Sequence, residues 1–562
     1  MPRMKNIPCT LPVTVLLMLF SQGLMAQCNP ADGGPETARG IVFQDMDQDR
    51  QRDGGEPGVA GVAVSNGCEV VVTDAEGAYS LSIWPGQILF ISQPTGYVVP
   101  VDTNQLPQFY YTHYPQGSPG TVAGTSVNWN FPVIEPTGPL PASIDFPLYR
   151  LSAAETRFTA HGFADTQAAT DLQEDMLRED LVNTLLGNPY GARFTITVGD
   201  VVNDNLALYP RHIEMMGLIG VPQWNLPGNH DINYESPNAR YANETYRRYF
   251  GPDYYSFNYG KAHIVALNNV EYAGAEVDYG GYRGFIPAHQ MAWLAADLAL
   301  VPRDYLVVIA THIPLLTDAL EGDGRRYNDG LNTVNFPQLL TLLSPFENVY
   351  GLAGHDTSNS WKMQIDHRHG WQGRPWIAHT LAEARGNGWS RGPADLRGVR
   401  DAMMQDGNPN GYYLLKFDDT SLVPEFIPFP FGADAAQRMR IVLDPPLNVP
   451  EGGGINRGTL QPGTKIVVNL FDGGERDRLS VSLDGADIQP MAHVLRTDPF
   501  VERVYRELLE SDASFGEPAE SSHVFEWALP AGLAPGLHSA VVTSEDEFGQ
   551  RHRGVITFEV LP

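Results

Sequence analysis

The chain has 562 residues, more than one hydrophobic core normally serves, so we expect two to four domains. Hydrophobic residues make up 43% and charged residues 18%, which excludes wholesale disorder, and 56 glycines and 44 prolines predict much turn and β-structure. The formal net charge of -29 excludes long-range attraction to nucleic acid or anionic lipid. We therefore expect no nucleic-acid binding, and a metal cation is a better prospect as a ligand than a polyanion.

The N-terminal residues predict an export signal. Two basic residues lie among the first five, an uncharged apolar stretch covers residues 11–20, and the small residue Ala26 follows. This pattern is typical of a secretory signal peptide, here residues 1–26, and predicts a periplasmic or extracellular protein. The alternatives are an uncleaved anchor, which the short apolar stretch disfavours, and a lipid anchor on Cys28. We expect no transmembrane segment elsewhere in the chain.

Three cysteines occur in the chain, and Cys9 leaves with the signal peptide. Cys28 and Cys68 remain, and an oxidising compartment favours a disulfide between them. The alternative is a pair of free thiols.

Residues 27–150 predict an N-terminal β-sandwich module. Short alternating runs such as GIVFQD, GVAVS and QILFIS are separated by turns. Together with the turn residues Thr73, Asp74, Gly77 and Tyr79, this segment resembles the prealbumin-like modules of bacterial surface proteins.

An acidic loop, DMDQDRQRDGGE, lies inside this module. Oxygen ligands at alternating positions can converge on one calcium ion, and the loop follows that register at positions 1, 3, 5, 7, 9 and 12, with Gln51 at position 7. Position six is Arg50 where an EF-hand has glycine, and the flanks predict strands, so the loop is not an EF-hand. Two interpretations stay open, a calcium site and an acidic loop that is only solvated. The carboxylates concerned are Asp45, Asp47, Asp49, Asp53 and Glu56.

Residues 151–380 predict an α/β domain, because apolar β-runs alternate with helical periodicity. Helices are expected at DLQEDMLREDLVNTLLG and PAHQMAWLAADLALV. Residues 381–562 begin as a loop-rich stretch and continue as short alternating runs, which predict a C-terminal β-domain. Its boundary is open, since the run GYYLLKF could complete the central sheet.

Polar clusters follow the predicted strands of the central domain. They are ADTQ at residues 164–167, GDVVND at 199–204, GNHD at 228–231, THIP at 311–314 and GHDT at 354–357. Open α/β sheets bind ligands at the carboxyl ends of their strands, so we expect these clusters to meet in one crevice.

The order and contents of these clusters resemble the calcineurin-like metallophosphoesterase family. A stretch after the core resembles a secreted subgroup with β-domains on both sides of the catalytic core, and it consists of Asp406, Gly407, Pro409, Asn410, Gly411 and Tyr412. The resemblance implies a four-layer α/β/β/α sandwich flanked by an N-terminal prealbumin-like β-sandwich and a C-terminal β-domain.

The resemblance also implies a dinuclear metal site. Two ions activate a water molecule and stabilise charge on a phosphoryl group. Asp200 would bridge the ions, Asp165 and Gln167 would complete the first, and the second would take Asn229, His312 and His355. Oxygen and imidazole ligands without thiolate suit Mn, Fe or Zn and do not select among them.

Further roles follow from the same resemblance. His230 would contact the phosphoryl group and protonate the leaving oxygen, Asp231 would orient the His230 imidazole, and Asp204 would support these loops. The sequence departs from the family pattern at Thr357, where the last histidine of the first site is normally found. Asp356 or Asn359 could compensate for it.

Two functions are consistent with these residues. The first is an exported, metal-dependent phosphohydrolase that acts on a phosphomonoester or phosphodiester of a small molecule or head group. The alternative is a non-catalytic surface binding protein built on a degenerate phosphoesterase fold.

Overall fold

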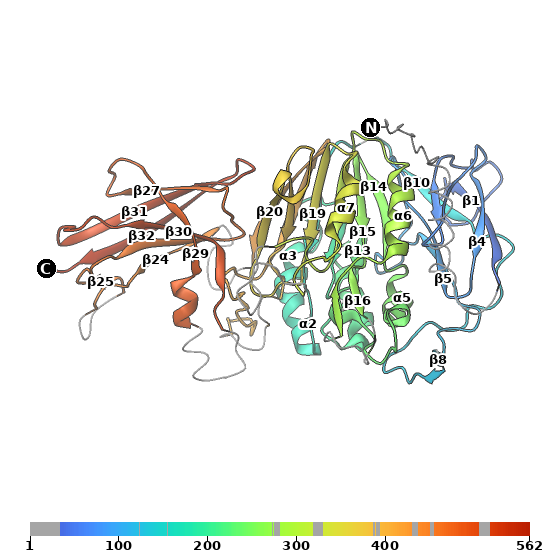
Figure 1. Ribbon diagram of the computed structural model, residues 1–562, viewed down its shortest axis with the longest axis horizontal. Coiled ribbons are helices and arrows are strands. Elements are labelled where there is room, and N and C mark those ends of the chain that lie inside the picture. The colour runs from blue at the N-terminus through green and yellow to red at the C-terminus, as the bar shows by residue number, and fades with distance from the viewer. Residues whose placement is uncertain are drawn as a thin grey trace, which may run out of the picture.

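The computed structural model describes residues 34–562, with gaps at 123, 154, 273, 275–280, 318–329, 386–387, 389–393, 430–436, 450–454 and 505–516. Three parts of the chain lie in a row: an N-terminal β-module, a central α/β domain and a C-terminal β-domain (Figure 1). The expected signal peptide and Cys28 fall outside the described residues. Within the described part, no helix has the length and apolar character to cross a membrane.

The N-terminal module contains two four-stranded sheets, in the orders β4-β1-β10-β6 and β3-β2-β5-β7. Alternating burial along β4, with Tyr79, Leu81 and Ile83 inside, shows that one face of this strand covers a core. Cys68 is disulfide-bonded, and its expected partner Cys28 lies outside the described residues. The strands are β1 (Glu36–Gln44), β2 (Ala63–Ser65), β3 (Val70–Val72), β4 (Ala78–Ile83), β5 (Gln87–Ile91), β6 (Tyr97–Val98), β7 (Tyr110–His113) and β10 (Phe146–Arg150), with a separate pair β8 (Thr121–Val122) and β9 (Thr125–Ser126).

Two sheets form the central domain, and they pack face to face. Trp224 of one sheet stacks on Phe257 of the other, with ring centroids 4.1 Å apart. The five-stranded sheet has the order β13-β12-β11-β22-β23, and the six-stranded sheet has the order β14-β15-β18-β19-β21-β20. The first consists of β11 (Arg157–Phe163), β12 (Thr195–Val198), β13 (Gln223–Leu226), β22 (Gly411–Asp418) and β23 (Ser421–Pro428). The second consists of β14 (Tyr255–Tyr259), β15 (Ala262–Ala266), β18 (Leu306–Ala310), β19 (Asn348–Ala353), β20 (Trp361–Ile365) and β21 (Trp376–Thr380), and β16 (Val270–Tyr272) pairs with β17 (Tyr282–Gly284) outside it.

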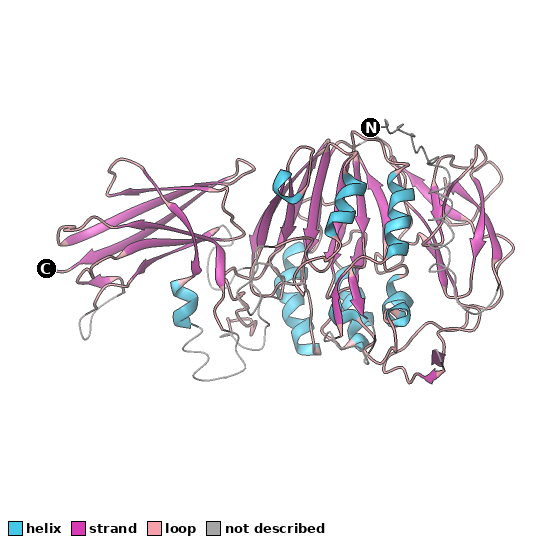
Figure 2. Cartoon of the chain, in the orientation of Figure 1, coloured by secondary structure: helices cyan, strands magenta, loops and turns pink. Residues whose placement is uncertain are grey.

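Helices cover the outer faces of both sheets (Figure 2). Met176 and Met215 pack with Phe163 and Leu414 of the five-stranded sheet, whereas α6 and α7 lie across the six-stranded sheet. Both expected helices are confirmed. The helices and helical turns are α2 (Asp171–Leu177), η1 (Arg178–Val182), α3 (Asn183–Leu185), η2 (Leu206–Leu208), α4 (Tyr209–Gly217), η3 (Asn229–Asp231), η4 (Ala239–Tyr241), α5 (Glu244–Phe250), α6 (Ala288–Leu298), α7 (Phe336–Leu343) and η5 (His367–His369).

The central sheet extends beyond the boundary expected at residue 380. Strand β22 pairs antiparallel with β11, with His161 opposite Leu414, and β23 pairs with β22. The division between 151–380 and 381–562 is therefore wrong, and the central domain runs through Pro428. The reason is physical, because β11 needs a hydrogen-bonding partner on the side away from β12.

The C-terminal domain consists of two sheets, in the orders β24-β26-β30-β29 and β25-β32-β31-β27-β28. Their strands pair antiparallel, except that β25 pairs parallel with β32. Val468, Phe525, Val542 and Phe558 lie in its core. The strands are β24 (Met439–Asp444), β25 (Arg457–Gly458), β26 (Lys465–Leu470), β27 (Arg478–Leu483), β28 (Gln489–Pro490), β29 (Ala492–Thr497), β30 (Glu520–Ala528), β31 (Gly536–Glu545) and β32 (Arg551–Val560).

A buried polar cluster joins this domain to the central one. Asp472 accepts hydrogen bonds from His379 Nε2 at 2.9 Å and from the Tyr413 hydroxyl at 2.8 Å, and Lys362 Nζ lies 3.3 Å from its other oxygen. All four side chains are buried or nearly so, and three of them come from the central domain.

Candidate functional site

Five residues from the predicted clusters stand just after parallel strands. Asp165, Asp200 and Asn229 follow β11, β12 and β13, and His312 and His355 follow β18 and β19. Asp165, Asp200 and His355 have positive φ values of 48°, 50° and 74°. Such backbone is costly for residues other than glycine and is concentrated at functional sites.

Four of these residues converge on one point. His312 Nε2 lies 3.2 Å from Asp200 Oδ1, 2.9 Å from Asn229 Oδ1 and 3.2 Å from His355 Nδ1. The ligand atoms of Asp200, His312 and His355 all lie within 4.8 Å of one another. Oxygen and imidazole donors gathered this closely fit one divalent cation.

Each imidazole is oriented through its other nitrogen. His312 Nδ1 lies 3.0 Å from the carbonyl oxygen of Val198, and His355 Nε2 lies 2.9 Å from that of Gly330. A ring nitrogen that donates to a carbonyl leaves its opposite nitrogen free to bind a metal. The chain therefore presents His312 Nε2 and His355 Nδ1 as ligand atoms.

Glycines make room for these ligands. A Cβ on Gly228 would lie 2.1 Å from Asp200 Oδ1, and a Cβ on Gly199, whose φ is 89°, would lie 2.4 Å from His312 Nδ1. Any side chain at either position would push a ligand out of place.

The charges of the site influence one another strongly. Burial would raise the pKa of Asp200, but His312 and His230 outweigh it and hold the pKa below its ordinary value. Burial lowers the pKa of His312, yet Asp200 raises it to about 9 overall. Burial and the charge of His312 together lower the pKa of His355 to about 3. Asp200 is therefore the ionised centre of this cluster.

Gln167 and Asp165, the residues expected to complete the first ion, form hydrogen bonds with other protein groups instead of meeting at a common point. Gln167 Nε2 donates to Asp200 Oδ2 at 2.6 Å, and its Oε1 accepts from Arg385 Nη1. Asp165 Oδ2 accepts from the His355 amide at 2.9 Å, while Oδ1 is buried without a hydrogen-bond partner among the described residues. Burial raises the pKa of Asp165 to about 7, opposed by His312 and reinforced by Asp200. This place does not fit a cation ligated by Gln167.

Compensation for Thr357 by its neighbours is not observed. Asp356 accepts from the Ser358 amide at 3.0 Å and from Trp361 Nε1 at 2.9 Å. Asn359 donates to the carbonyl of Glu520 at 2.8 Å. These side chains stabilise the loop and its contact with the C-terminal domain, so the expectation that they complete the first site is wrong.

His230 lies at the edge of the cluster and is partly open to solvent, with 30% of its side chain exposed. Its Nδ1 lies 2.8 Å from Asp204 Oδ1, and its Nε2 lies 3.9 Å from Asp200 Oδ2. Burial would lower the pKa of His230, but Asp200 and the hydrogen bond to Asp204 raise it above its ordinary value. The ring is therefore held in place by Asp204 and biased toward its protonated form.

The expected role of Asp231 is wrong. Its carboxylate accepts from the Gly228 amide at 2.8 Å, the Val201 amide at 3.1 Å and the Tyr209 hydroxyl at 2.8 Å. Asp231 thus ties the GNHD turn to the loop after β12, and Asp204 takes the role of orienting His230.

Two residues near the site were missed by the sequence reasoning. Glu383 and Arg385 follow β21, and this segment runs beside the residues just after β11, with the Arg385 amide donating to the Asp165 carbonyl at 3.0 Å. Both carboxylate oxygens of Glu383 are buried without a partner in the described part of the chain. Burial and the nearby Asp165 raise the pKa of Glu383 well above its ordinary value. The signal that could have found them is polar residues directly after an apolar strand.

The acidic loop of the N-terminal module brings some of its carboxylates together. Ligand atoms of Asp45, Asp47 and Glu56 lie within 4.8 Å of one another, and a second such group contains Asp47, Asp49 and Asp53. Backbone amides of the loop already donate to Asp45 and Glu56, so the loop is ordered by its own hydrogen bonds. Calcium binding there stays a prediction.

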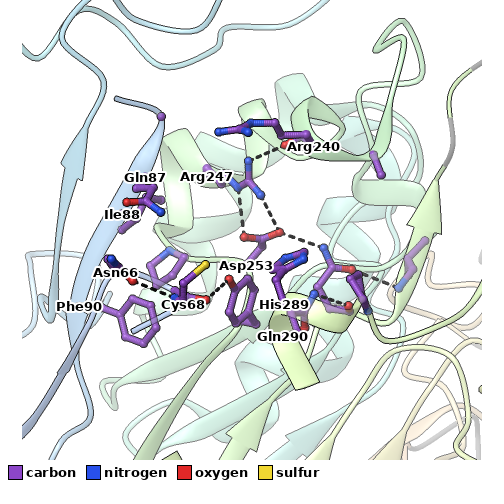
Figure 3. A pocket seen from close by; sticks show the side chains of 18 of the residues that line it. Asn66, Cys68, Gln87, Ile88, Phe90, Arg240, Arg247, Asp253, His289 and Gln290 are labelled. Atoms are coloured by element: carbon purple, nitrogen blue, oxygen red, sulfur yellow. Dashed lines mark hydrogen bonds and ion pairs between the residues drawn. The ribbon is translucent and has the colours of Figure 1, made fainter. Parts of the chain in front are cut away.

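A pocket of about 290 Å³ lies between the N-terminal module and the central domain (Figure 3). Phe90 and Gln87 contribute from one side, and Arg247, Asp253 and His289 from the other. Arg247 donates to Asp253 at 3.1 and 3.0 Å, so the main charges of the pocket are paired with each other. None of the strand-end residues described above lines it.

Comparison with known proteins finds family models that match the chain on either side of the strand-end residues. Residues 46–123 match the family model described as the N terminal of calcineurin-like phosphoesterase, and residues 379–552 match the C terminal of calcineurin-like phosphoesterase. These two matches support the calcineurin-like metallophosphoesterase family, and with it a phosphoric ester hydrolase. The family implies a dinuclear centre of divalent metal ions, and the donors around His312 fit one of the two.

Among solved structures, a purple acid phosphatase isolated from yellow lupin (Lupinus luteus) seeds is similar at 13% identity and a TM-score of 0.34, covering 71% of this chain and 67% of that chain. No curated protein sequence matches the chain.

Proposed function

We propose that the protein is an exported metal-dependent phosphohydrolase that cleaves a phosphomonoester or phosphodiester of a small molecule or lipid head group. The observation that carries the proposal is the convergence of Asp200, Asn229, His312 and His355 at the strand ends of two facing sheets. These residues would hold a divalent cation, and Mn, Fe and Zn all suit their oxygen and imidazole donors.

A bound cation polarises a phosphoryl oxygen and lowers the pKa of bound water. The chain itself contributes proton transfer. His230 is partly exposed beside the cluster, and Asp204 fixes its Nδ1, so Nε2 is free to give a proton to the leaving oxygen. Asp231 keeps the GNHD turn against the loop after β12, which positions His230 and Asn229 together.

The proposal includes export of the protein, a four-layer core and a prealbumin-like N-terminal module. The disulfide at Cys68 supports an oxidising compartment and therefore the export expected from residues 1–26. The two facing sheets with helices outside support a four-layer α/β/β/α core, and the paired sheets of the first module support a prealbumin-like β-sandwich.

The test is hydrolysis of nitrophenyl phosphate and bis(nitrophenyl) phosphate by the purified mature protein with and without added Mn. We expect metal-dependent turnover, and a loss of about 100-fold or more for His230→Ala and for Asp200→Asn. Asp487→Asn, an exposed change in the C-terminal domain, serves as the matched control and should keep wild-type activity. Full activity in both site variants would exclude the proposal, and no turnover with Mn, Fe or Zn would favour the non-catalytic binding protein.

A further inference from the structure

The side chain of Gln167 is fully engaged at the place where the first ion is expected. Its Oε1 accepts from Arg385 Nη1, and its Nε2 donates to Asp200 Oδ2 at 2.6 Å. A guanidinium has donors and no acceptor, so it must face the oxygen of the amide. Arg385 therefore turns the one metal-binding atom of Gln167 away from Asp200 and toward an existing positive charge.

The two oxygens of Asp200 have different partners. Oδ1 lies 3.2 Å from His312 Nε2 and accepts from the His230 amide at 2.9 Å. Oδ2 accepts from Gln167 and lies near the His230 ring. A carboxylate that bridged two ions would offer one oxygen to each, whereas here an N–H group occupies the second oxygen.

The remaining candidates for the first ion do not assemble a site. Thr357 has no imidazole, and the polar atoms of Asp356 and Asn359 are committed elsewhere. Among the described residues, the ligand atoms of Asp200, His312 and His355 meet within 4.8 Å, but those of Asp165, Asp200 and Glu383 form no such group.

Arg385 instead supplies positive charge to this acidic place. Its backbone amide is bonded to the carbonyl of Asp165, which tethers the residue beside β11. Asp165 and Glu383 are both fully buried there, and the charge of Arg385 opposes the rise that burial causes in the pKa of Glu383. The same fixed positive charge repels a divalent ion from this space.

We propose that the centre holds a single cation, at Asp200, Asn229, His312 and His355, and that the guanidinium of Arg385, linked to Asp200 through Gln167, replaces the other ion. This inference rests on the proposed function, because it assumes a metal-dependent centre. It departs from the dinuclear arrangement that the family implies.

The experiment measures metal content rather than activity. Metal-free mature protein is titrated with Mn by calorimetry, and the desalted complex is analysed for bound Mn by elemental analysis. We expect one ion per chain for the wild type, and one for the control Arg374→Ala, which removes an exposed arginine. The double variant Thr357→His/Arg385→Ala restores an imidazole and removes the guanidinium, and we expect it to bind a second ion.

The outcomes separate the two proposals. One ion in the wild type and two in the double variant support the inference. Two ions in the wild type overturn the inference but are consistent with the proposed metal-dependent phosphohydrolase. This outcome is measured on the wild type alone, so it does not depend on whether a variant folds. One ion in a double variant that still binds its first ion overturns the role of Arg385. No ion in the wild type overturns the proposed function itself.

Discussion

At the scale of single residues, the partner of His230 is Asp204, which is distant in the sequence, and not the adjacent Asp231. In the sequence GNHD, Asp231 is adjacent to His230, but the helical turn η3 (Asn229–Asp231) points successive side chains in different directions. The Asp231 carboxylate turns inward to backbone amides, and Asp204, which has a φ of 60°, reaches the imidazole instead. Adjacency along the chain predicts contact poorly inside a turn.

The pairing of His230 with Asp204 predicts a pH effect. The raised pKa of His230 keeps the ring protonated to higher pH, so activity that needs this acid falls as the pH rises through that pKa. Asp204→Asn removes one of the causes of the raised pKa of His230 and should move the alkaline limb of kcat/KM to lower pH. The measurement is the pH profile of nitrophenyl ester hydrolysis.

The exposed substitution Asp304→Asn is the control for this profile, and its alkaline limb should match that of the wild type. An unchanged or higher-pH limb for Asp204→Asn would contradict the assignment of Asp204 as the partner of His230.

Sequence reasoning located the residues at the strand ends but not all of their partners. Asp200, Asn229, His312 and His355 each follow an apolar strand, and parallel strands carry such residues to one edge. The contact between Gln167 and Arg385 joins residues 218 positions apart, and no periodicity or local motif encodes it. Long-range side-chain contacts of this kind depend on the packed sheets.

At the scale of elements, the joint between the two central sheets depends on aromatic stacking. Trp224 on β13 and Phe257 on β14 are buried, and their ring planes are 6° apart. The alternating apolar runs predict both strands, but they do not say which strand faces which across the sandwich. The run GYYLLKF was considered as the strand that completes the central sheet, but its place beside β11 stayed open for the same reason, because a long loop-rich connection precedes it.

Trp224→Ala should destabilise the central domain by about 3 to 5 kcal/mol, since it removes a large buried ring from a packed interface. The measurement is the urea unfolding midpoint followed by circular dichroism. Leu537→Ala removes a side chain that is 82% exposed, and it should change stability by less than about 0.5 kcal/mol. Equal stability of the two variants would show that the sheets do not depend on this stacked pair.

At the scale of the whole molecule, Asp472 links the C-terminal domain to the central one. Burial would raise the pKa of Asp472, but Lys362 and His379 outweigh it and lower the pKa to about 2. A carboxyl with a lowered pKa adds stability above its unfolded pKa, and this contribution is lost as the pH falls from about 4 toward 2. The shift corresponds to about 2 kcal/mol at neutral pH.

Asp472→Asn should therefore lower stability at pH 7 and flatten its dependence on pH below about 4, because the titrating group is gone. It also leaves Lys362 buried without its carboxylate, which raises the total loss to about 3 to 5 kcal/mol. Urea unfolding between pH 3 and pH 7 measures both effects. The exposed Asp487→Asn is the control, and parallel curves for Asp472→Asn and wild type would refute the link.

The position of β22 beside β11 has a consequence for biosynthesis. A ribosome that has reached Thr380 has already translated every residue assigned to the cation site, yet the strand that leads to Asp165 still has an unpaired edge. The nascent polypeptide gains its closing strand only when Gly411–Asp418 emerges, so the sheet is assembled late, after the ligands themselves exist. A gene fragment stopped at Thr380 would carry the four cation ligands and expose an aggregation-prone strand edge.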